Sequence, residues 1–473
     1  MSETLSHPVA GSDAGIWDSI REALRGSHRD YTEGSVSRAI LLLAVPMVLE
    51  MIMESVFAVC DVFFVSKLGA SAVATVGLTE SWLMLIYAIA MGLAISASAI
   101  VARRIGEKDR DGAARAAGQA ILLSVALSAA LGIAGVLLAP RLLAVMGASP
   151  DVISGGTNYT RMMLGGSMTI VMLFMINAIF RGAGDAAIAM LVLWLANAIN
   201  ILLGPCLIFG LGPFPELGVT GAAVATTIGR GTGALFALSR LLSSGSRVDI
   251  HARHLGLDVA LVKRIVRIGW SATLQMLIGM CSWIALIRVL STFGSNVLAG
   301  YTIGIRVVMF ALLPAFGVAN AAATMVGQAL GARKPERAER AVKIAGTYSM
   351  VVLTVVGAAL ALFAPFIARL FTQDASITPY ATKVLRIVAC GFPFYAWGMV
   401  ISQSFNGAGD TRTPTLLNLF VFWLWEIPLA FVLAKVVGWG STGIFVAIAV
   451  AFSTFAVAGV LLFRRGTWKL KRV

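Results

Sequence analysis

The feature that most constrains this chain is a series of apolar runs, each long enough to cross a lipid bilayer as a helix. A helix needs about 20 apolar residues to span the hydrocarbon core, and twelve such runs are separated here by short polar joints. Only 13% of the residues are charged, whereas soluble domains average about 25%. The sequence therefore predicts an all-α polytopic membrane protein. The predicted spans are residues 39–65, 77–102, 113–139, 158–180, 187–210, 218–242, 265–292, 299–330, 341–364, 380–405, 413–434 and 442–463.

An internal repeat divides the chain into two halves with an offset of 225 residues. Phe180–Asp185 reads FRGAGD, and Phe405–Asp410 reads FNGAGD. The same offset relates three further pairs: Gly92 and Gly317, Gly106 and Gly331, and Pro140 and Pro365. Each half contains six predicted spans, an even number, so the two halves insert in the same orientation around a central cavity. We therefore expect twelve transmembrane helices in two pseudo-symmetric six-helix bundles.

The repeat and the polar joints define the expected domain organisation. We predict a cytoplasmic N-terminal tail over 1–37, an N-lobe over 38–243, a cytoplasmic linker over 244–262, a C-lobe over 263–464 and a basic cytoplasmic tail over 465–473. Lys and Arg concentrate in the joints on one side of the spans, which places both termini in the cytoplasm. The net charge of +14 is thus explained by topology, and we expect no nucleic-acid partner.

The cysteines and histidines give no sign of a disulfide or a metal centre. All four cysteines lie in predicted spans without a Cys-x-x-Cys pair, and all four histidines lie outside the spans. His251 and His254 have a spacing that can bind a metal, but no further ligand accompanies them, which favours a solvated loop. We expect no cofactor other than a transported ion.

The first predicted span carries three carboxylates on one helical face: Glu50, Glu54 and Asp61. Their spacings of 4 and 7 place them within about 40° of one another around a helix. A charged acid at mid-membrane costs roughly 2.5–3.5 kcal/mol on insertion scales, so this face must contact protein or water. The repeat-related positions are Gln275, Gly279 and Leu286. Since the second half lacks the acids, an ion- or proton-binding role is favoured over a purely structural one.

Several motifs resemble the multidrug and toxic compound extrusion (MATE) family over residues of about 36–463. These motifs are the paired GAGD joints, the V-x-x-x-x-G joints at 101–106 and 326–331, and the sequence DVFFVSKLG at 61–69. The resemblance implies two six-helix lobes with a cleft between them, and export of organic cations coupled to inward flow of H⁺ or Na⁺. It also implies that Asp61 takes part in ion coupling.

The fifth span departs from the family pattern. Many prokaryotic members have Asn, three residues and then Asp-Pro, whereas here Asn200 is followed by Gly204-Pro205. Glu50 or Glu54 is our candidate for the missing titratable group, because neighbouring buried carboxylates titrate as a unit. For Na⁺, Asp61, Asn200 and carbonyls freed by a helix broken at Gly204-Pro205 are the candidate ligands. We favour H⁺ slightly and leave Na⁺ open.

Five further polar or aromatic residues of the spans are candidates for substrate binding. Intramembrane acids are functional by default, an aromatic face can hold a lipophilic cation, and amides supply hydrogen bonds. These candidates are Glu80, Gln275, Arg306, Trp423 and Glu426. Three intramembrane arginines either pair with the buried acids or extend to a membrane interface, or else they line the cavity and favour an anionic or zwitterionic substrate: Arg230, Arg288 and Arg306.

The glycine-rich GAGD joints are interpreted as tight turns whose Asp185 and Asp410 cap the following helices. The chain has no Walker-type phosphate loop, so transport must draw on an ion gradient. We expect a monomeric, multi-pass antiporter of the bacterial inner membrane that exports organic cations among the membrane lipids. A lipid-linked oligosaccharide flippase, with the three arginines holding a pyrophosphate, is the alternative, and no motif supports an enzyme.

Overall fold

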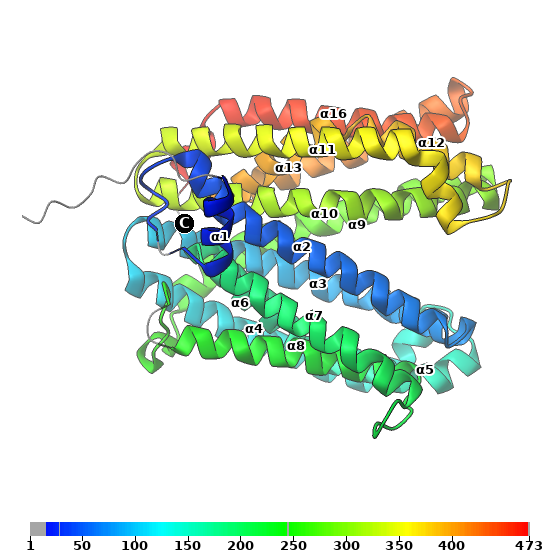
Figure 1. Cartoon of the computed structure of the whole chain (residues 1–473), viewed down its shortest axis with the longest axis horizontal. Coiled ribbons are helices and arrows are strands. Elements are labelled where there is room, and N and C mark those ends of the chain that lie inside the picture. The colour runs from blue at the N-terminus through cyan, green and yellow to red at the C-terminus, as the bar shows by residue number, and fades with distance from the viewer. Residues whose placement is uncertain (1–15, 28, 244–245, 472–473) are drawn as a thin grey trace, which may run out of the picture.

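The computed structural model describes residues 16–27, 29–243 and 246–471, and the regular structure of this part is helical throughout (Figure 1). The α-helices are α1 (Ile16–Arg25), α2 (Val36–Ser66), α3 (Ala70–Gly106), α4 (Arg110–Val145), α5 (Pro150–Gly165), α6 (Ser167–Ala183), α7 (Ala186–Phe209), α8 (Val219–Leu242), α9 (Val259–Leu290), α10 (Ser295–Gly331), α11 (Pro335–Phe371), α12 (Thr378–Ala389), α13 (Phe392–Gly407), α14 (Arg412–Asn418), α15 (Ile427–Phe431) and α16 (Ser441–Arg464). Short elements are the 3₁₀ turns η1 (Ala252–Leu255), η2 (Ser291–Phe293) and η5 (Thr467–Leu470) and the π-helical segments η3 (Leu419–Glu426) and η4 (Val432–Val436).

Each predicted span is helical, although not every span is one straight apolar helix. Ten helices of the described chain are long and apolar enough to cross a membrane, and the bent pair α12–α13 makes an eleventh. The predicted span 158–180 crosses a break at Gly166 between α5 and α6, and 380–405 crosses the 58° bend between α12 and α13. The span 218–242 corresponds to α8, which falls outside this set because Arg230 and several glycines and threonines lower its hydropathy.

The helices form two bundles that repeat the same packing. Helices α2–α8 make one bundle and α9–α16 the other, side by side in Figure 1. In the first bundle the indole nitrogen of Trp194 on α7 donates to the carbonyl of Leu49 on α2, at 3.1 Å. In the second, Trp423 donates to the carbonyl of Ile278 on α9, at 3.0 Å. The sequence repeat is therefore also a repeat of helix pairing.

The two bundles approach most closely at glycines that the repeat relates. A Cβ at Gly92 of α3 would collide with Thr273 of α9, and a Cβ at Gly317 of α10 would collide with Met47 of α2. Gly106 and Gly331 meet each other's helices in the same way. Only residues without a Cβ permit this approach, so the repeated glycines mark the contact between the bundles.

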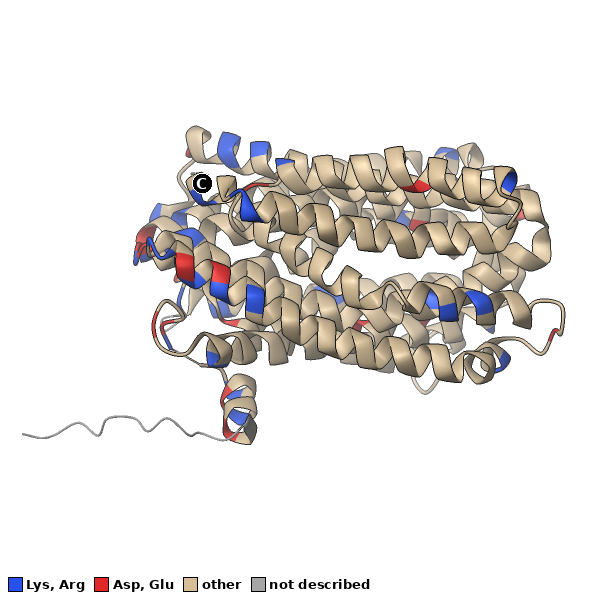
Figure 2. Cartoon of the chain, turned by 90° about the horizontal axis from the view of Figure 1, so that it is seen from above, with Lys and Arg blue, Asp and Glu red and all other residues tan. Residues whose placement is uncertain are grey.

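At the end of the molecule that carries both described chain ends, the N-terminal segment joins the two bundles. Arg337 of α11 donates hydrogen bonds to the carbonyls of Tyr31, Glu33 and Gly34, at 2.7–2.9 Å. Beside the first bundle, Arg247 of the stretch after α8 donates to the carbonyls of Ser27 and Arg29, and its guanidinium lies over the Tyr31 ring at 4.7 Å. Figure 2 shows that charged residues gather at this end.

The C-terminal segment makes a second connection at the same end. The ammonium of Lys471 lies 3.2 Å from the carboxylate of Asp410, which belongs to the second bundle. The carbonyl of Lys471 accepts a hydrogen bond from Arg103 of α3, at 3.0 Å. Both chain ends therefore hold the bundles together on one side, while the ribbons of α2 and α10 diverge toward the opposite side (Figure 1).

The proline of the fifth predicted span lies inside a continuous helix. The expected break at Gly204-Pro205 is wrong, because α7 continues to Phe209 without interruption. Pro46 likewise lies well inside α2, which begins at Val36. A proline removes one backbone hydrogen bond, yet both segments are helical on either side of it.

The GAGD joints are turns as expected, but their aspartates act differently. Gly184 and Gly409 have φ of +90° and +81°, the left-handed region that favours glycine. Asp185 occupies the N-cap position of α7 without a capping hydrogen bond from its side chain within the described chain, and its carboxylate pairs with Arg247 at 3.1 Å. Asp410 accepts from the hydroxyl of Thr413 at 2.7 Å. These aspartates therefore tie the turns to neighbouring segments.

The stretch between the bundles is docked on α4. Gln119 donates to the carbonyls of His254 and Gly256, at 3.2 and 2.8 Å. The side chain of His254 is buried, with Nε2 lying 3.0 Å from the carboxylate of Asp111. The expectation of a solvated loop is therefore wrong for His254, because the imidazole closes a contact between the linker and the first bundle.

Candidate functional site

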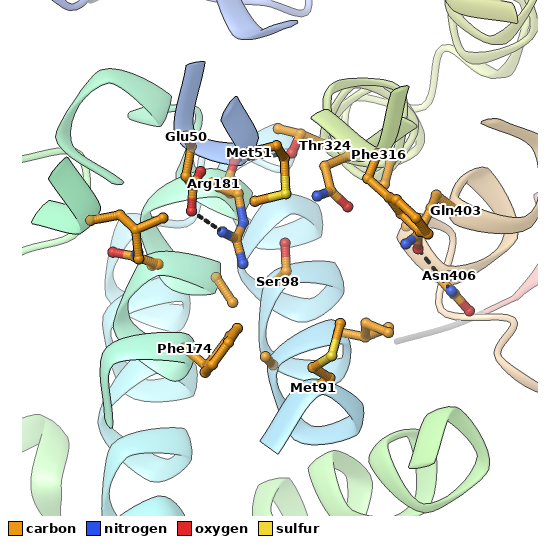
Figure 3. Close-up of a pocket in the computed structure, with 18 of the residues that line it drawn as sticks. Glu50, Met51, Met91, Ser98, Phe174, Arg181, Phe316, Thr324, Gln403 and Asn406 are labelled. Carbon is orange, nitrogen blue, oxygen red and sulfur yellow. Dashed lines mark hydrogen bonds and ion pairs between the residues drawn. The ribbon is translucent and has the colours of Figure 1, made fainter. Parts of the chain in front are cut away.

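A cavity of about 290 Å³ lies between the two bundles (Figure 3). It is lined from one side by α2, α3, α6 and α7 and from the other by α10 and α13. Toward the chain ends it is closed by hydrogen bonds across the bundles: Thr324 donates to the carbonyl of Arg181, and Gln328 to that of Gly182, both at 3.0 Å. A substrate held here contacts both repeats.

Two of the three carboxylates predicted on the first span line this cavity. Glu50 is only 2% exposed, and its Oε1 lies 2.6 Å from Nη1 of Arg181 on α6. Glu54, one turn further along α2, accepts a hydrogen bond from the amide of Asn197 on α7, at 3.0 Å. Asp61 is half-buried and lies beyond the lining residues. The acidic face of α2 therefore runs from the cavity floor toward the opposite end of the molecule.

The charges in the cavity do not balance. Glu50 and Arg181 form an ion pair, which leaves Glu54 with a neutral amide as its hydrogen-bonding partner. A carboxylate in an apolar site is stabilised by an opposite charge. Apolar and aromatic walls surround it, among them Met51, Met91, Phe174 and Phe316. Such a site can hold a lipophilic molecule that carries one positive charge.

Asn200 does not line the cavity and contacts α8 instead. Its side-chain amide donates to the hydroxyl of Thr226 on α8, at 2.9 Å, and it is buried. The nearest atom to a Cβ built at Gly204 is Oδ1 of Asn200, at 3.9 Å. The oxygen of Asn200 therefore faces the turn of α7 where the sequence has glycine in place of an acid.

Arg230 of α8 lies inside the first bundle and outside the cavity lining. It is 7% exposed, and its Nη1 lies 2.6 Å from the hydroxyl of Tyr87 on α3. Its guanidinium also lies 5.8 Å from the ring centroid of Phe57. The charges of Glu54 and Asp61 act on it, although it forms no direct ion pair with either among the described residues.

None of the five residues predicted to bind substrate lines the cavity. Glu80 on α3 and Arg306 on α10 are exposed side chains whose charges act on each other. Gln275 is buried in the second bundle and donates to the hydroxyl of Ser402, at 3.2 Å. The indole of Trp423 is engaged by the backbone of α9.

Glu426 also lies within the second bundle, at the end of the π-helical segment η3. It is 6% exposed, and its charge acts on Tyr301 and Tyr395. Its carboxylate has no hydrogen bond or ion pair with any residue that the structure describes. Glu426 is therefore a buried acid of the second bundle, and it lies apart from the acids of α2 that line the cavity.

The partners of the two cavity acids could not be identified from the sequence. Arg181 lies on α6 and Asn197 on α7, so no spacing along one helix pairs them with Glu50 and Glu54. One signal for Arg181 was present: it lies in the first GAGD joint, where the second repeat has Asn406. Both repeat-related residues line the cavity floor.

The arginines do not form an anion site in the cavity. The residues Arg230, Arg288 and Arg306 are all absent from its lining. Arg230 is held by Tyr87, whereas Arg288 and Arg306 are exposed. The lipid-linked oligosaccharide alternative therefore loses the observation on which it depended.

Comparisons with known proteins agree on one family. A sequence profile described as MatE matches residues 46–206 and 272–432, once in each half. The probable multidrug resistance protein NorM of Thermotoga maritima is 26% identical over 444 residues, which cover 93% of this chain and 94% of that protein. A crystal structure of MATE in complex with MaL6 has a TM-score of 0.88 and 30% identity, covering 96% of this chain and 99% of that one. An outward-facing MATE transporter structure has a TM-score of 0.87 and 30% identity, covering 93% and 98%.

Proposed function

Since this chain belongs to the MatE family of multidrug exporters, we propose that it is a secondary active antiporter that exports lipophilic organic cations in exchange for H⁺. The observation that carries this proposal is the unbalanced carboxylate of Glu54 in an apolar cavity between the two lobes. Na⁺ is the alternative coupling ion.

The topology of the proposal follows from charge. Basic residues concentrate at the end with both chain ends, and the positive-inside tendency places that end in the cytoplasm. With this orientation the cavity is closed toward the cytoplasm, so the conformation is outward-facing. We place the protein in a bacterial inner membrane as a monomer, because one chain encloses the whole cavity between its own lobes.

Ion coupling in this proposal uses the acidic face of α2. Asp61, Glu54 and Glu50 form a line from the outer side to the cavity floor, with Asn200 behind it. Protonation from outside removes the negative charge that attracts the cation, and the substrate leaves. The lobes, expected over 38–243 and 263–464, then rock about the linker, and the proton leaves on the cytoplasmic side.

Substrate contact in this proposal is centred on Glu54 and the apolar cavity wall. Glu80 and Arg306 are residues that a substrate passes on its way out. Gln275, Trp423 and Glu426 were predicted to bind substrate, but they do not line the cavity. We propose instead that they act on the movement of the C-lobe.

The test is transport in proteoliposomes that carry a fluorescent lipophilic cation and either a pH or a Na⁺ gradient. We expect transport under the pH gradient, and we expect Asp61→Asn and Glu54→Gln to abolish it. Asp151→Asn, the same chemical change at an exposed position of α5, is the matched control and should transport normally. No cation movement under either gradient, with folded protein, would overturn the proposal.

A further inference from the structure

We propose that Arg230 makes the N-lobe coupling site accept a proton rather than Na⁺, by supplying a fixed internal cation beside Glu54 and Asp61. This inference rests on the proposed antiport function and names the residue that sets its coupling ion. Arg230 would act as a positioning residue, because it contacts neither the substrate cavity nor a bound ion.

The guanidinium is fixed in place by two aromatic residues from two helices, Tyr87 of α3 and Phe57 of α2. Tyr87 accepts its hydrogen bond at 2.6 Å, and the rings of Phe57 and Tyr87 lie 5.8 and 5.7 Å from its central carbon. Hydroxyl and ring contacts both stabilise a cation in an apolar setting. Arginine also keeps its charge at every physiological pH. The positive charge is therefore permanent and cannot leave with the transported ion.

The charged and titratable groups that face Arg230 come from the helices around α8. On α2 its guanidinium lies 5.8 Å from the ring of Phe57, and Glu54 and Asp61 lie about one helical turn before and after Phe57 on the same face. Helix α3 contributes Tyr87. Helix α5 contributes the buried Tyr159, whereas its Asp151 and Arg161 are exposed. Helix α7 contains no Asp, Glu, Lys, Arg or His, and α6 contains only Arg181 at its cytoplasmic end. The negative charges near Arg230 thus come from α2, with Glu80 further out.

The balance of charge favours a proton. Arg181 offsets Glu50, and Arg230 partly offsets Glu54 and Asp61, so this face of the N-lobe carries one uncompensated negative charge. One proton neutralises it without desolvating a second ion. A Na⁺ would need several oxygen ligands close to a guanidinium that repels it, in a region of low dielectric constant. Gly204 supplies no further carboxylate on the facing helix.

The experiment compares Arg230→Ala with Arg230→Lys in the proteoliposome assay, under separate pH and Na⁺ gradients. Arg288→Ala, which removes an exposed arginine of α9, is the matched control. For the wild type we expect transport driven by the pH gradient and unaffected by Na⁺. For Arg230→Ala we expect that a Na⁺ gradient drives transport. We also expect the pH of half-maximal H⁺-driven transport to rise by about one unit, because the carboxylates of α2 lose a nearby positive charge. Arg230→Lys keeps the charge and should stay H⁺-driven.

Each outcome separates this inference from the proposed function. Wild-type transport driven by Na⁺ alone would overturn the role of Arg230 and leave the antiport intact. No transport under either gradient would overturn the antiport itself. An Arg230→Ala protein indistinguishable from Arg288→Ala would overturn the inference, and so would an Arg230→Lys protein that turns to Na⁺. Thermal unfolding in detergent shows whether each variant has folded. If Arg230→Ala has not folded, the coupling ion of the wild type and of Arg230→Lys decides whether the inference holds.

Discussion

At the cavity floor, the two oxygens of the Glu50 carboxylate differ: Oε1 is paired with Arg181, whereas the buried Oε2 has no hydrogen-bond partner among the described residues. A buried ion pair contributes little net stability, because desolvation offsets attraction. Removing one partner of the ion pair is costly, because the other charge is then left buried and unpaired in an apolar setting. The pair is therefore better explained by a role in the cavity than by stability.

Removing Arg181 should therefore damage the protein more than removing both partners. We expect Arg181→Ala to lower the free energy of unfolding by about 3–5 kcal/mol. The double variant with Glu50→Gln should recover much of that loss, since no unpaired charge remains. Thermal or denaturant unfolding in detergent micelles measures both. Equal losses in the single and double variants would show that the pair does not act as a unit.

The sequence was sufficient to predict those residues of the site that lie together on one helix. Spacing along the first span was sufficient to place Glu50, Glu54 and Asp61 on one face. Their partners Arg181 and Asn197 lie 131 and 143 residues away in the chain, so only the packing of α6 and α7 on α2 brings them together. The five residues predicted to bind substrate lie outside the cavity. A hydropathy profile indicates how deep a residue lies in the membrane, but it does not indicate the direction in which its helix face points.

At the scale of the helices, the sequence repeat predicted the contacts between the lobes better than it predicted breaks within a helix. Gly92 and Gly317 were identified as repeat partners, and they lie at the crossings of α3 with α9 and of α10 with α2. The break expected at Pro205 is absent, since neighbouring helices compensate for one lost backbone hydrogen bond. Interruptions occur instead at Gly166, between α5 and α6, and at the 58° bend between α12 and α13.

Adding a methyl group at the crossing glycines should loosen the closed side of the cavity. Cβ atoms at Gly92 or Gly317 would collide with the facing helix, so we expect Gly92→Ala and Gly317→Ala to destabilise this conformation by about 1–3 kcal/mol. Gly77 of α3 has no atom within 4 Å of such a Cβ, and Gly77→Ala is the matched control. Spin-label distances between the lobes, measured at the end that carries both chain ends, report the effect. Unchanged distances in all three variants would contradict a tight crossing.

At the scale of the whole molecule, the contacts between lobes are one-sided. The N-terminal segment, the C-terminal segment and the glycine crossings all join the lobes at the end with both chain ends. At the opposite end, Gly77 and Gly279 have nothing near their missing Cβ atoms. In the alternating-access transport that we propose, contacts form at this second end as those at the first are released. The side chains available to form them carry opposite charges: Glu80 on the N-lobe and Arg306 on the C-lobe.

Closing the outer end should therefore bring Glu80 and Arg306 together. We expect the double variant Glu80→Cys, Arg306→Cys to be cross-linked by a short bifunctional thiol reagent, and transport to stop when it is, because the lobes can no longer reopen. The native cysteines Cys60, Cys206, Cys281 and Cys390 must first be replaced by serine or alanine, since all are free thiols. Each single-cysteine variant, treated alike, controls for modification without a bridge. A substrate that favours the conformation closed at the outer end should speed the cross-linking. A cross-linked protein that still transports would contradict the prediction, because this end of the cavity would then not need to open and close. The rate of cross-linking thus measures the population of the conformation that is closed at the outer end, whereas the structure is open there.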